Sequence, residues 1–398
     1  MVCKGHEGVP EFVCTEYCER TKNYCLLIPV INEGQRIQAE LRRAQAADVS
    51  RHVDIVICDG GSVDGSLADG ILTELGVNTL LVKTGPGKQG AQLRMGIWWA
   101  LERGYEGIIT VDGNNKDSIE DVPAFVKKLE DGYDFVQGSR FIAGGKAVNT
   151  PFSRYWAVKL LHAPAISLTA GQKFTDTTNA FRAYSRRYLE DPRVRPLRDI
   201  FAGYELLAYL SVRASQLGLK ACEIPVCRAY PKNEKTPTKI SPFKGNLNLL
   251  KILLSNAEGK YLPEGEKPGR LSTSIQFVKF LLVGASNTVV LLAVYYLVLW
   301  LLGRSYYLLG QTLGYAAGIL NSFFWNSRYV FAPKKKSGAA SFLKMTLSYG
   351  VTYVLQAGLL TALVDWCHVS EILAPLLAIA VTTPINFVLN RLFVFPGD

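Results

Sequence analysis

Residues 54–66 read Asp-Ile-Val-Ile-Cys-Asp-Gly-Gly-Ser-Val-Asp-Gly-Ser. The apolar first half predicts a buried strand, and the acids and glycines of the second half predict a turn at its carboxyl end. The same design recurs in residues 25–30, 79–83 and 107–111, with helical stretches between them. Strands that alternate with helices predict an α/β domain with a parallel sheet, whose strands end at the ligand site.

The C-terminal third contains a repeat. Phe277-Val278-Lys279-Phe280 opens one apolar stretch and Phe342-Leu343-Lys344-Met345 opens a second, at an offset of 342 − 277 = 65 residues. Each copy holds two segments long enough to cross roughly 30 Å of hydrocarbon. The four segments are residues 275–302, 306–327, 342–364 and 371–391. They predict an all-α four-helix transmembrane domain, and the flanking basic residues predict that both termini are cytoplasmic.

These patterns divide the chain into four parts. They are an N-terminal tail (1–23), the α/β domain (24–240), an amphipathic interfacial segment with a linker (241–270) and the transmembrane domain (271–398). Over residues 243–257, apolar residues recur at spacings of three and four, which predicts a helix lying on the membrane surface. The formal net charge is +10. Because basic residues lie next to apolar segments and no nucleic-acid motif is present, we expect anionic lipid and phosphorylated ligands, and no nucleic acid.

Two short patterns suggest other sites. The cysteines of the N-terminal tail can hold a metal ion together with His6, although free thiols are the simpler interpretation because no Cys-x-x-Cys pair is present. Residues 85–90 satisfy Gly-x-Gly-x-x-Gly, and Asp112 follows 112 − 90 = 22 residues later. That spacing is typical of nicotinamide- or flavin-binding folds. The loop follows the third strand rather than the first and contains Lys88, which disfavours that interpretation.

Further motifs occur in order along the α/β domain. The first set is Asn32-Glu33, Asp59 to Ser66, Gly87 to Gly96 and Asp112-x-Asn114. Together they resemble the inverting glycosyltransferases of family 2, which have a GT-A fold. The second set is Gly138-Ser139-Arg140-Phe141, Arg154, Asp176 to Arg182, Glu223-Ile224-Pro225-Val226 and Thr238-Lys239. It resembles the polyprenyl-phosphate, dolichyl-phosphate mannose synthase-like branch. Residues 275–396 are similar to the GtrA-like membrane domain found beside lipid-linked sugar enzymes.

The resemblance implies a nucleotide-sugar site at the carboxyl ends of the strands. The residues implied are Pro29, Val30, Glu33, Asp59, Lys88 and Asp112. The first three would frame the nucleoside, and Asp59 would accept a hydrogen bond from its base or ribose. Lys88 and Arg94 supply positive charge for the donor diphosphate. Asp59 also fits a second interpretation, in which it caps its own loop.

The resemblance also implies a divalent cation, Mg²⁺ or Mn²⁺. The family's Asp-x-Asp motif holds this ion, but the second position here is Asn114. The implied ligands are Asp112 and Asn114, whose amide oxygen can ligate the ion without adding charge. Three alternatives stay open: weaker binding of the ion, replacement of the missing acid by Asp117, or partial substitution of the ion by Lys116.

The implied acceptor is a polyprenyl phosphate, either undecaprenyl or dolichyl phosphate, bound by Arg140, Arg154 and Lys239. A phosphate monoester is already ionised near neutral pH. It therefore needs positioning and charge compensation rather than a strong general base. The implied catalytic residues are Asp112, Asn114, Arg140 and Arg154. Salt bridges to nearby acids are the alternative role for the two arginines.

The predicted function is transfer of one sugar from a UDP- or GDP-sugar to the lipid phosphate, with inversion, at the cytosolic membrane face. Such a hexosyltransferase would be an integral membrane protein, and the resemblance also implies a homo-oligomer, since related membrane domains associate. A non-catalytic glycolipid-binding or flipping protein and a nicotinamide-dependent enzyme are the alternatives. A processive synthase is disfavoured because the chain lacks its Gln-x-x-Arg-Trp motif. The sequence leaves the sugar open among glucose, mannose and N-acetylhexosamine.

Overall fold

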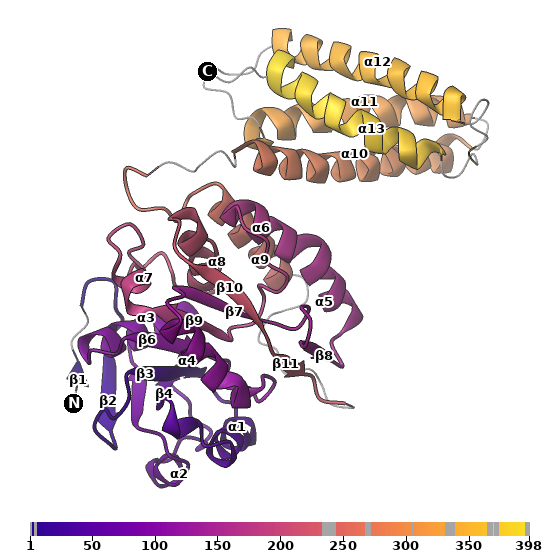
Figure 1. Cartoon of the computed structure of the whole chain (residues 1–398). Coiled ribbons are helices and arrows are strands. Elements are labelled where there is room, and N and C mark those ends of the chain that lie inside the picture. Colours follow the sequence, from indigo (N-terminus) through magenta and orange to yellow (C-terminus); the bar gives the residue numbers. More distant parts are fainter. Residues whose placement is uncertain are drawn as a thin grey trace. The chain divides into compact units, whose positions relative to one another are not determined.

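The computed structural model describes residues 2–3, 6–232, 244–266, 272–303, 306–330, 339–363, 369 and 374–394. The chain divides into two compact units, Met1–Leu271 and Ser272–Asp398 (Figure 1). The first is an α/β unit, and the described part of the second is helical.

A nine-stranded sheet forms the centre of the first unit, in the order β1-β2-β5-β4-β3-β6-β9-β7-β10. The bounds are β1 Val2–Cys3, β2 Phe12–Glu16, β3 Tyr24–Val30, β4 Asp54–Asp59, β5 Thr79–Lys83, β6 Gly107–Thr110, β7 Phe135–Ser139, β9 Arg182–Ser185 and β10 Ala221–Pro225. Strands β5, β4, β3 and β6 are parallel, as are β7 and β10, whereas β9 runs antiparallel between β6 and β7. The four predicted strands are confirmed as β3 to β6.

The apolar runs form strands that are buried on both faces. Leu27 packs into one core, and its neighbours Leu26 and Ile28 pack into another, because successive strand side chains point to opposite faces of a sheet. Helices contribute to both cores. The first contains residues of α3 Gln89–Glu102, α6 Ala163–Ala170, α7 Arg186–Glu190 and α8 Glu205–Gln216, and the second contains residues of α1 Gln35–Ala46, α2 Asp69–Glu74 and α4 Val122–Glu130. Because helices cover both faces of the sheet, a ligand can reach it at the ends of the strands.

A small second sheet connects distant parts of the chain. Strand β8 (Lys146–Val148) pairs in parallel with β11 (Cys227–Ala229), and Arg228 of β11 also forms a backbone bridge with Asp117. The chain around β11 is thereby placed against the loop that follows β6. After β8, the helix α5 (Phe152–Ala157), a π-helical turn (Val158–His162) and α6 follow one another without a break.

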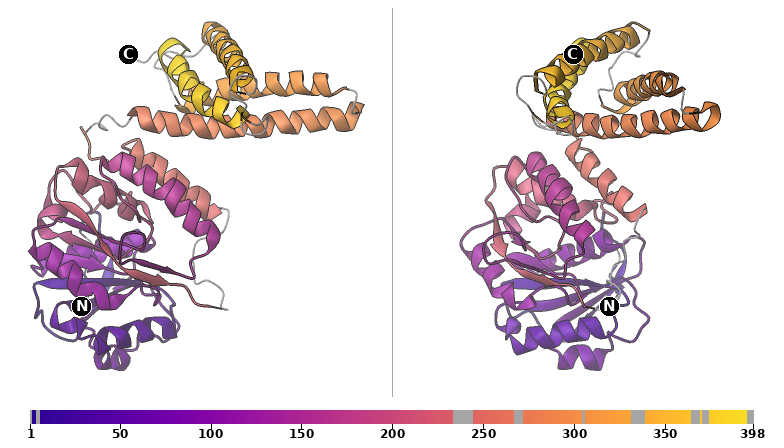
Figure 2. Two further views of the ribbon diagram at one scale, coloured as in Figure 1. Left: turned by 45° about the vertical axis from the view of Figure 1, so that its right-hand side comes forward. Right: turned by 90° about the vertical axis from the view of Figure 1, so that its right-hand side faces the viewer.

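Helix α9 (Lys244–Ala257) forms where an amphipathic helix was predicted. It packs against α6 and α8, and α6 and α9 lie side by side in Figure 2. Leu253 is buried in the core of the first unit, and Nδ2 of Asn256 donates to the Ala208 carbonyl at 2.9 Å. The apolar residues that predicted the membrane-surface helix are Phe243, Leu247, Leu250, Leu254 and Ala257, and Ala257 of this set is buried within the protein unit instead. Phe243 of that set lies outside the described residues.

The second unit contains α10 (Ser272–Leu302), α11 (Tyr307–Trp325), α12 (Ala339–Thr361) and α13 (Ala374–Leu389). Short π-helical turns, Asn326–Val330 and Asn390–Val394, follow α11 and α13 and preserve the similarity of the two repeats. Polar side chains join α10 and α11, because Nδ2 of Asn321 donates to Ser286 Oγ at 2.9 Å and to Asn287 Oδ1 at 2.8 Å. Over the described residues, none of the helices is both long enough and apolar enough to cross a membrane.

Candidate active site

The carboxyl ends of β3, β4 and β6 meet at one edge of the sheet. Val30, the last residue of β3, lies opposite Asp59, the last residue of β4. Helix α3 ties this edge together through two glutamine amides. Nε2 of Gln92 donates to the Val30 and Cys58 carbonyls at 2.7 and 2.8 Å, and Nε2 of Gln89 donates to Asp112 Oδ1 at 3.0 Å. Asp59 and Asp112 are thereby positioned by the same helix.

Asp59 shapes its own loop. It is 3% exposed and accepts hydrogen bonds from the backbone N–H of Gly61 at 3.0 Å, the N–H of Ser62 at 2.9 Å and the Ser62 hydroxyl at 2.6 Å. Gly61 has a φ of 95°, a left-handed conformation that favours glycine. The loop-capping interpretation is therefore correct for this conformation, and hydrogen bonding to a nucleoside stays a prediction.

The other donor-site predictions fall into two groups. Pro29 and Val30 are buried in β3, and the Val30 side chain belongs to the hydrophobic core. Glu33 pairs with Arg36 at 3.0 Å, and the Lys88 side chain is exposed while its backbone N–H donates to the Ala202 carbonyl at 2.9 Å. Of these four, only Glu33 and Lys88 therefore present side-chain atoms to solvent.

Arg94 does not supply free positive charge at this edge. It is 3% exposed, and Nη1 donates to Asp199 Oδ1 at 2.7 Å and to the Gly8 carbonyl. The prediction that Arg94 approaches the donor diphosphate is wrong for this conformation, because the ion pair already uses its charge. The local glycine pattern was visible in the sequence, but the partner lies 105 residues away.

The loop after β6 carries an acidic cluster joined to β11. Arg228 of β11 reaches both acids of the loop: Nη1 lies 2.5 Å from Asp117 Oδ2, and Nη2 lies 3.2 Å from Asp112 Oδ2. The side chains of Arg228 and Asp117 are 5% and 0% exposed, whereas that of Asp112 is 20% exposed. Asp112 is thus the acid that remains accessible. Arg228 was not among the predicted site residues.

Burial and neighbouring charge set the ionisation of this cluster. Burial alone would raise the pKa of Asp112, but Arg228, Lys116 and the hydrogen bond from Gln89 together hold that pKa below its usual value. For Asp117, burial dominates over Arg228 and the pKa is raised. Burial and the proximity of Arg228 lower the pKa of Lys116. Asp112 is therefore the carboxylate best suited to act as an anion.

The oxygen atoms around Asp112 suit a divalent metal ion only in part. Within the described residues around this loop, three buried side-chain oxygens accept no hydrogen bond: Oδ1 of Asn114, Oδ1 of Asp117 and Oε1 of Glu40, whose other oxygen accepts from the Asn115 N–H at 2.8 Å. However, no three His, Cys, Asp or Glu side chains in the described part of the chain are grouped to hold a metal. An ion here would use Asp112 and Asn114 and take its remaining oxygen ligands from a substrate or water.

Arg140 is held by an acid, as the alternative interpretation expected. Its Nε lies 2.6 Å from Asp176 Oδ2 and its Nη2 lies 2.9 Å from Asp176 Oδ1, with a further hydrogen bond to Thr178 Oγ1 at 2.9 Å. Both charged side chains are essentially buried. Among the described residues, Nη1 of Arg140 is buried and has no hydrogen-bond partner. One NH2 group of the guanidinium is therefore left without a partner among these residues.

Arg154 and Arg228 converge on Tyr230. Nη1 of Arg154 donates to the Tyr230 hydroxyl at 3.1 Å. The guanidinium of Arg154, that of Arg228 and the ammonium of Lys116 lie 5.6, 6.0 and 5.4 Å from the centre of the Tyr230 ring. Burial would raise the pKa of Tyr230, but Arg228, Arg154 and Arg140 lower it to about 8. Four cations therefore surround a single phenol.

Tyr230 and Arg228 are residues of the candidate site that sequence reasoning missed. The only signal was the segment Arg-Ala-Tyr-Pro, which follows the Glu-Ile-Pro-Val motif after one residue, Cys227. The structure brings Asp112, Arg154 and Arg140 near this segment, and Asn114 follows two residues after Asp112 in the adjoining loop. Lys239, the third residue predicted to bind the acceptor phosphate, lies outside the described residues.

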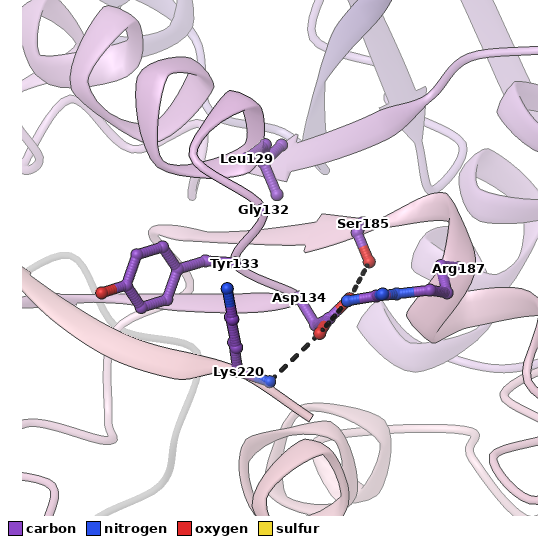
Figure 3. Close-up of a pocket in the computed structure, with 7 residues that line it drawn as sticks. All are labelled: Leu129, Gly132, Tyr133, Asp134, Ser185, Arg187 and Lys220. Atoms are coloured by element: carbon purple, nitrogen blue, oxygen red, sulfur yellow. Dashed lines mark hydrogen bonds and ion pairs between the residues drawn. The ribbon is translucent and has the colours of Figure 1, made fainter. Parts of the chain in front are cut away.

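A pocket elsewhere in the unit is structural (Figure 3). Asp134, at the amino end of β7, is 1% exposed and accepts hydrogen bonds from Ser185 Oγ at 2.8 Å, the Lys220 N–H at 3.1 Å and Arg187 Nη2 at 2.7 Å. These partners come from the ends of β9 and β10 and from α7. Because its carboxylate is fully used to join these elements, we assign the pocket no catalytic role.

Two family models match the chain. The glycosyl transferase family 2 model matches residues 25–192, and the GtrA/DPMS transmembrane domain model matches residues 279–395. An undecaprenyl-phosphate mannosyltransferase from Micrococcus luteus is 32% identical over 221 residues, which cover 54% of this chain and 86% of the relative. A dolichol-phosphate mannosyltransferase from Pyrococcus furiosus is 22% identical over 379 residues, which cover 92% of this chain and 97% of the relative.

Solved structures are more distant. Glucosyl-3-phosphoglycerate synthase from Mycobacterium tuberculosis matches with a TM-score of 0.43 and 14% identity, over 61% of this chain and 81% of that one. The mostly parallel sheet, the acids at its strand ends and the family match define a glycosyltransferase of the nucleotide-sugar class. The chain belongs to glycosyl transferase family 2 and carries a GtrA/DPMS transmembrane domain.

Proposed function

We propose that this glycosyltransferase transfers one sugar from a nucleoside-diphosphate sugar to a polyprenyl phosphate. The observation that carries the proposal is a continuous set of contacts from the donor edge to the basic cluster. Asp112 contacts Arg228, Arg228 lies over Tyr230, and Tyr230 accepts a hydrogen bond from Arg154. Tyr230 thereby connects the acid at the strand end, Asp112, to the arginine that would bind the acceptor phosphate, Arg154. The similarity to polyprenyl-phosphate mannosyltransferases supports the same reaction class.

On the donor side, the nucleoside would lie at the ends of β3 and β4, with its diphosphate toward Asp112. Lys88, which is exposed just before α3, would compensate diphosphate charge. The predicted Mg²⁺ or Mn²⁺ would be held by Asp112 and Asn114. When bound, such an ion neutralises the charge that develops on the departing nucleoside diphosphate.

On the acceptor side, the phosphate oxygen is the nucleophile and is already an anion, since its second pKa is about 6. Arg154 and the unpartnered Nη1 of Arg140 would hold that phosphate and orient it toward the sugar. Direct attack on the anomeric carbon opposite the leaving diphosphate would invert the configuration. A base is not needed, which agrees with a site of mostly basic side chains.

A bilayer surface is the proposed setting. Arg154 lies on α5, and the same helical stretch exposes Phe152, Trp156 and Leu160, which are 79%, 42% and 70% exposed. Their spacing of four residues keeps them in one stripe, and the exposed Lys159 lies beside it. A lipid surface would cover this stripe and present the lipid phosphate to Arg154. We propose four membrane spans with the catalytic unit on the cytosolic side, as the distribution of basic residues favours.

The proposal is tested by incubating the full chain, in membranes, with polyprenyl phosphate and radiolabelled UDP-glucose, GDP-mannose or UDP-N-acetylglucosamine. We expect one donor to yield a labelled lipid product and an equal amount of nucleoside diphosphate. The control is Asp112→Asn, which should abolish both products. If lipid binds but no donor is turned over, a glycolipid-binding or flipping function replaces this one.

A further inference from the structure

Arg228 occupies an unusual position for a metal-dependent transferase. Its guanidinium spans the two carboxylates of the loop after β6, contacting Asp117 at 2.5 Å and Asp112 at 3.2 Å through different nitrogens. The planar guanidinium of an arginine can donate to two carboxylates at once through different nitrogens. The ammonium group of a lysine lacks this fixed geometry. The backbone of Arg228 is fixed by the pairing of β11 with β8 and by the bridge to Asp117. Only its side chain is therefore available to move.

The remaining oxygens are too few and too weakly charged to attract a free divalent ion. Asp112 Oδ1 accepts a hydrogen bond from Gln89, and Asp112 Oδ2 faces Arg228. Within the described loop after β6, the buried side-chain oxygens without a hydrogen-bond partner are Oδ1 of Asn114, which is neutral, and Oδ1 of the Arg228-paired Asp117. Mg²⁺ and Mn²⁺ prefer six oxygen ligands and anionic sites.

The charges of the cluster also balance. Asp112 and Asp117 contribute two negative charges, while Arg228 and the 5%-exposed Lys116 contribute two positive charges. An arriving divalent cation would therefore meet no net negative charge from these four side chains. A nucleoside diphosphate changes this balance, because its oxygens bring both negative charge and the missing ligands.

We propose that Arg228 is a tethered cation that excludes a free divalent ion from Asp112, so that the ion enters together with the nucleoside diphosphate. The inference rests on the donor site proposed above. The incoming ion displaces the guanidinium from Asp112, while Asp117 retains it by the shorter contact. Arg228 then lies beside Tyr230, with its charge directed to the same cluster as Arg154. The order of binding is thereby set by one side chain.

The test measures Mn²⁺ binding directly, from loss of the electron paramagnetic resonance signal of free Mn²⁺. The full-length protein in lipid nanodiscs is titrated with Mn²⁺ alone, with UDP and with GDP. For the wild type we expect binding at least about ten-fold tighter with one of the two nucleotides than without either. Arg228→Met should bind Mn²⁺ alone at least about ten-fold tighter than the wild type, since the competing cation is gone.

Two further variants keep the result interpretable. Arg187→Met removes a guanidinium from buried Asp134 elsewhere in the unit and should leave Mn²⁺ binding unchanged. Arg228→Gln also removes the charge, and it replaces Arg228→Met as the test variant if the latter does not fold. The proposal is overturned if both Arg228 variants bind Mn²⁺ no tighter than the wild type, or if wild-type binding is equally tight without nucleotide.

The outcome is separable from that of the proposed function, because Mn²⁺ binding requires no sugar transfer. Transfer activity combined with tight nucleotide-free Mn²⁺ binding would remove this inference alone. Failure to bind either nucleotide would remove both.

Discussion

Arg154 donates a hydrogen bond from Nη1 to the hydroxyl of Tyr230 at 3.1 Å, although the two residues are 76 positions apart. Arg154 lies on α5, the helix with the exposed apolar stripe. Tyr230 lies two residues after Arg228, which pairs with Asp112, so the contact connects α5 to the acidic loop. In the proposed reaction, Arg154 would exchange the phenol for the acceptor phosphate.

Arg154→Met should raise the KM for polyprenyl phosphate by roughly ten-fold or more while leaving the KM for the donor unchanged. A hydrogen bond to a charged group contributes about 1.5–3 kcal/mol, which corresponds to that range. The measurement is initial-rate kinetics with each substrate varied in turn. Arg51→Met is the control, since Arg51 is exposed and its ion pair is with nearby Asp48. A loss confined to the donor KM would contradict the acceptor role.

Tyr230 should titrate near pH 8 rather than near its ordinary value of 10. Absorbance at 295 nm of the wild type minus that of Tyr230→Phe should show one phenolate appearing at about this pH. Because the folded pKa is below the unfolded one, the stabilisation is fully present above pH 10 and is lost as pH falls through about 8. The stability of the wild type relative to Tyr230→Phe should therefore rise between these values. Identical titration curves for the two proteins would show that the neighbouring cations do not lower the pKa of Tyr230.

Arg140 and Asp176 should be strongly coupled. Removing either partner leaves a buried charge unpaired, so Arg140→Met and Asp176→Asn should each cost on the order of 3–5 kcal/mol in the free energy of unfolding. The double variant should cost clearly less than the sum of the two. Urea unfolding of the four proteins in a double-mutant cycle provides the measurement. Additive effects would show that the pair does not exist in solution.

The Asp134–Arg187 pair should behave asymmetrically. Arg187 is 68% exposed, so Arg187→Met should cost no more than about 1 kcal/mol. Asp134→Ala should lower the free energy of unfolding by roughly 2–4 kcal/mol, because the Ser185 hydroxyl and the Lys220 N–H would lose their hydrogen-bond acceptor. Comparing the two melting curves tests this, and equal losses would argue against a structural role for the carboxylate.

Gly90→Ala should disturb the start of α3. An added Cβ would lie 2.4 Å from the Gly203 carbonyl oxygen and 2.5 Å from that of Phe201, and both are backbone atoms. Moving this helix end would displace Gln89 from Asp112, so we expect a loss of about 1–3 kcal/mol and weaker donor binding. Gly70→Ala is the matched control, since nothing lies within 4 Å of its added Cβ and it is in the helix α2. Wild-type donor affinity in Gly90→Ala would show that the helix end is not needed.

Local patterns were sufficient for the framework of the first unit. The apolar runs that became β3 to β6 are continuous because these strands are buried on both faces, and each run ends at turn residues. For that reason, the sequence alone was enough to place Asp59 and Asp112 at strand ends. The 65-residue repeat likewise predicted helical segments in matching positions.

Roles that depend on a distant partner could not be assigned in this way. Arg94 and Arg140 were candidates for phosphate binding, yet Asp199 and Asp176 hold them, at separations of 105 and 36 residues. Helix α9 shows the same limit, because amphipathic spacing identifies an apolar face but not whether protein or lipid covers it.

The amino-acid sequence by itself determined the strands, the acids at their ends, the family and the repeated helices, because each depends on residues close together in the chain. Tertiary structure decided which charges meet. The pairing of β8 with β11 places Arg228 and Tyr230 against a loop more than a hundred residues earlier, and this pairing joins Asp112 to Arg154. Electrostatic partners are set by distance in space, and no local pattern encodes that distance.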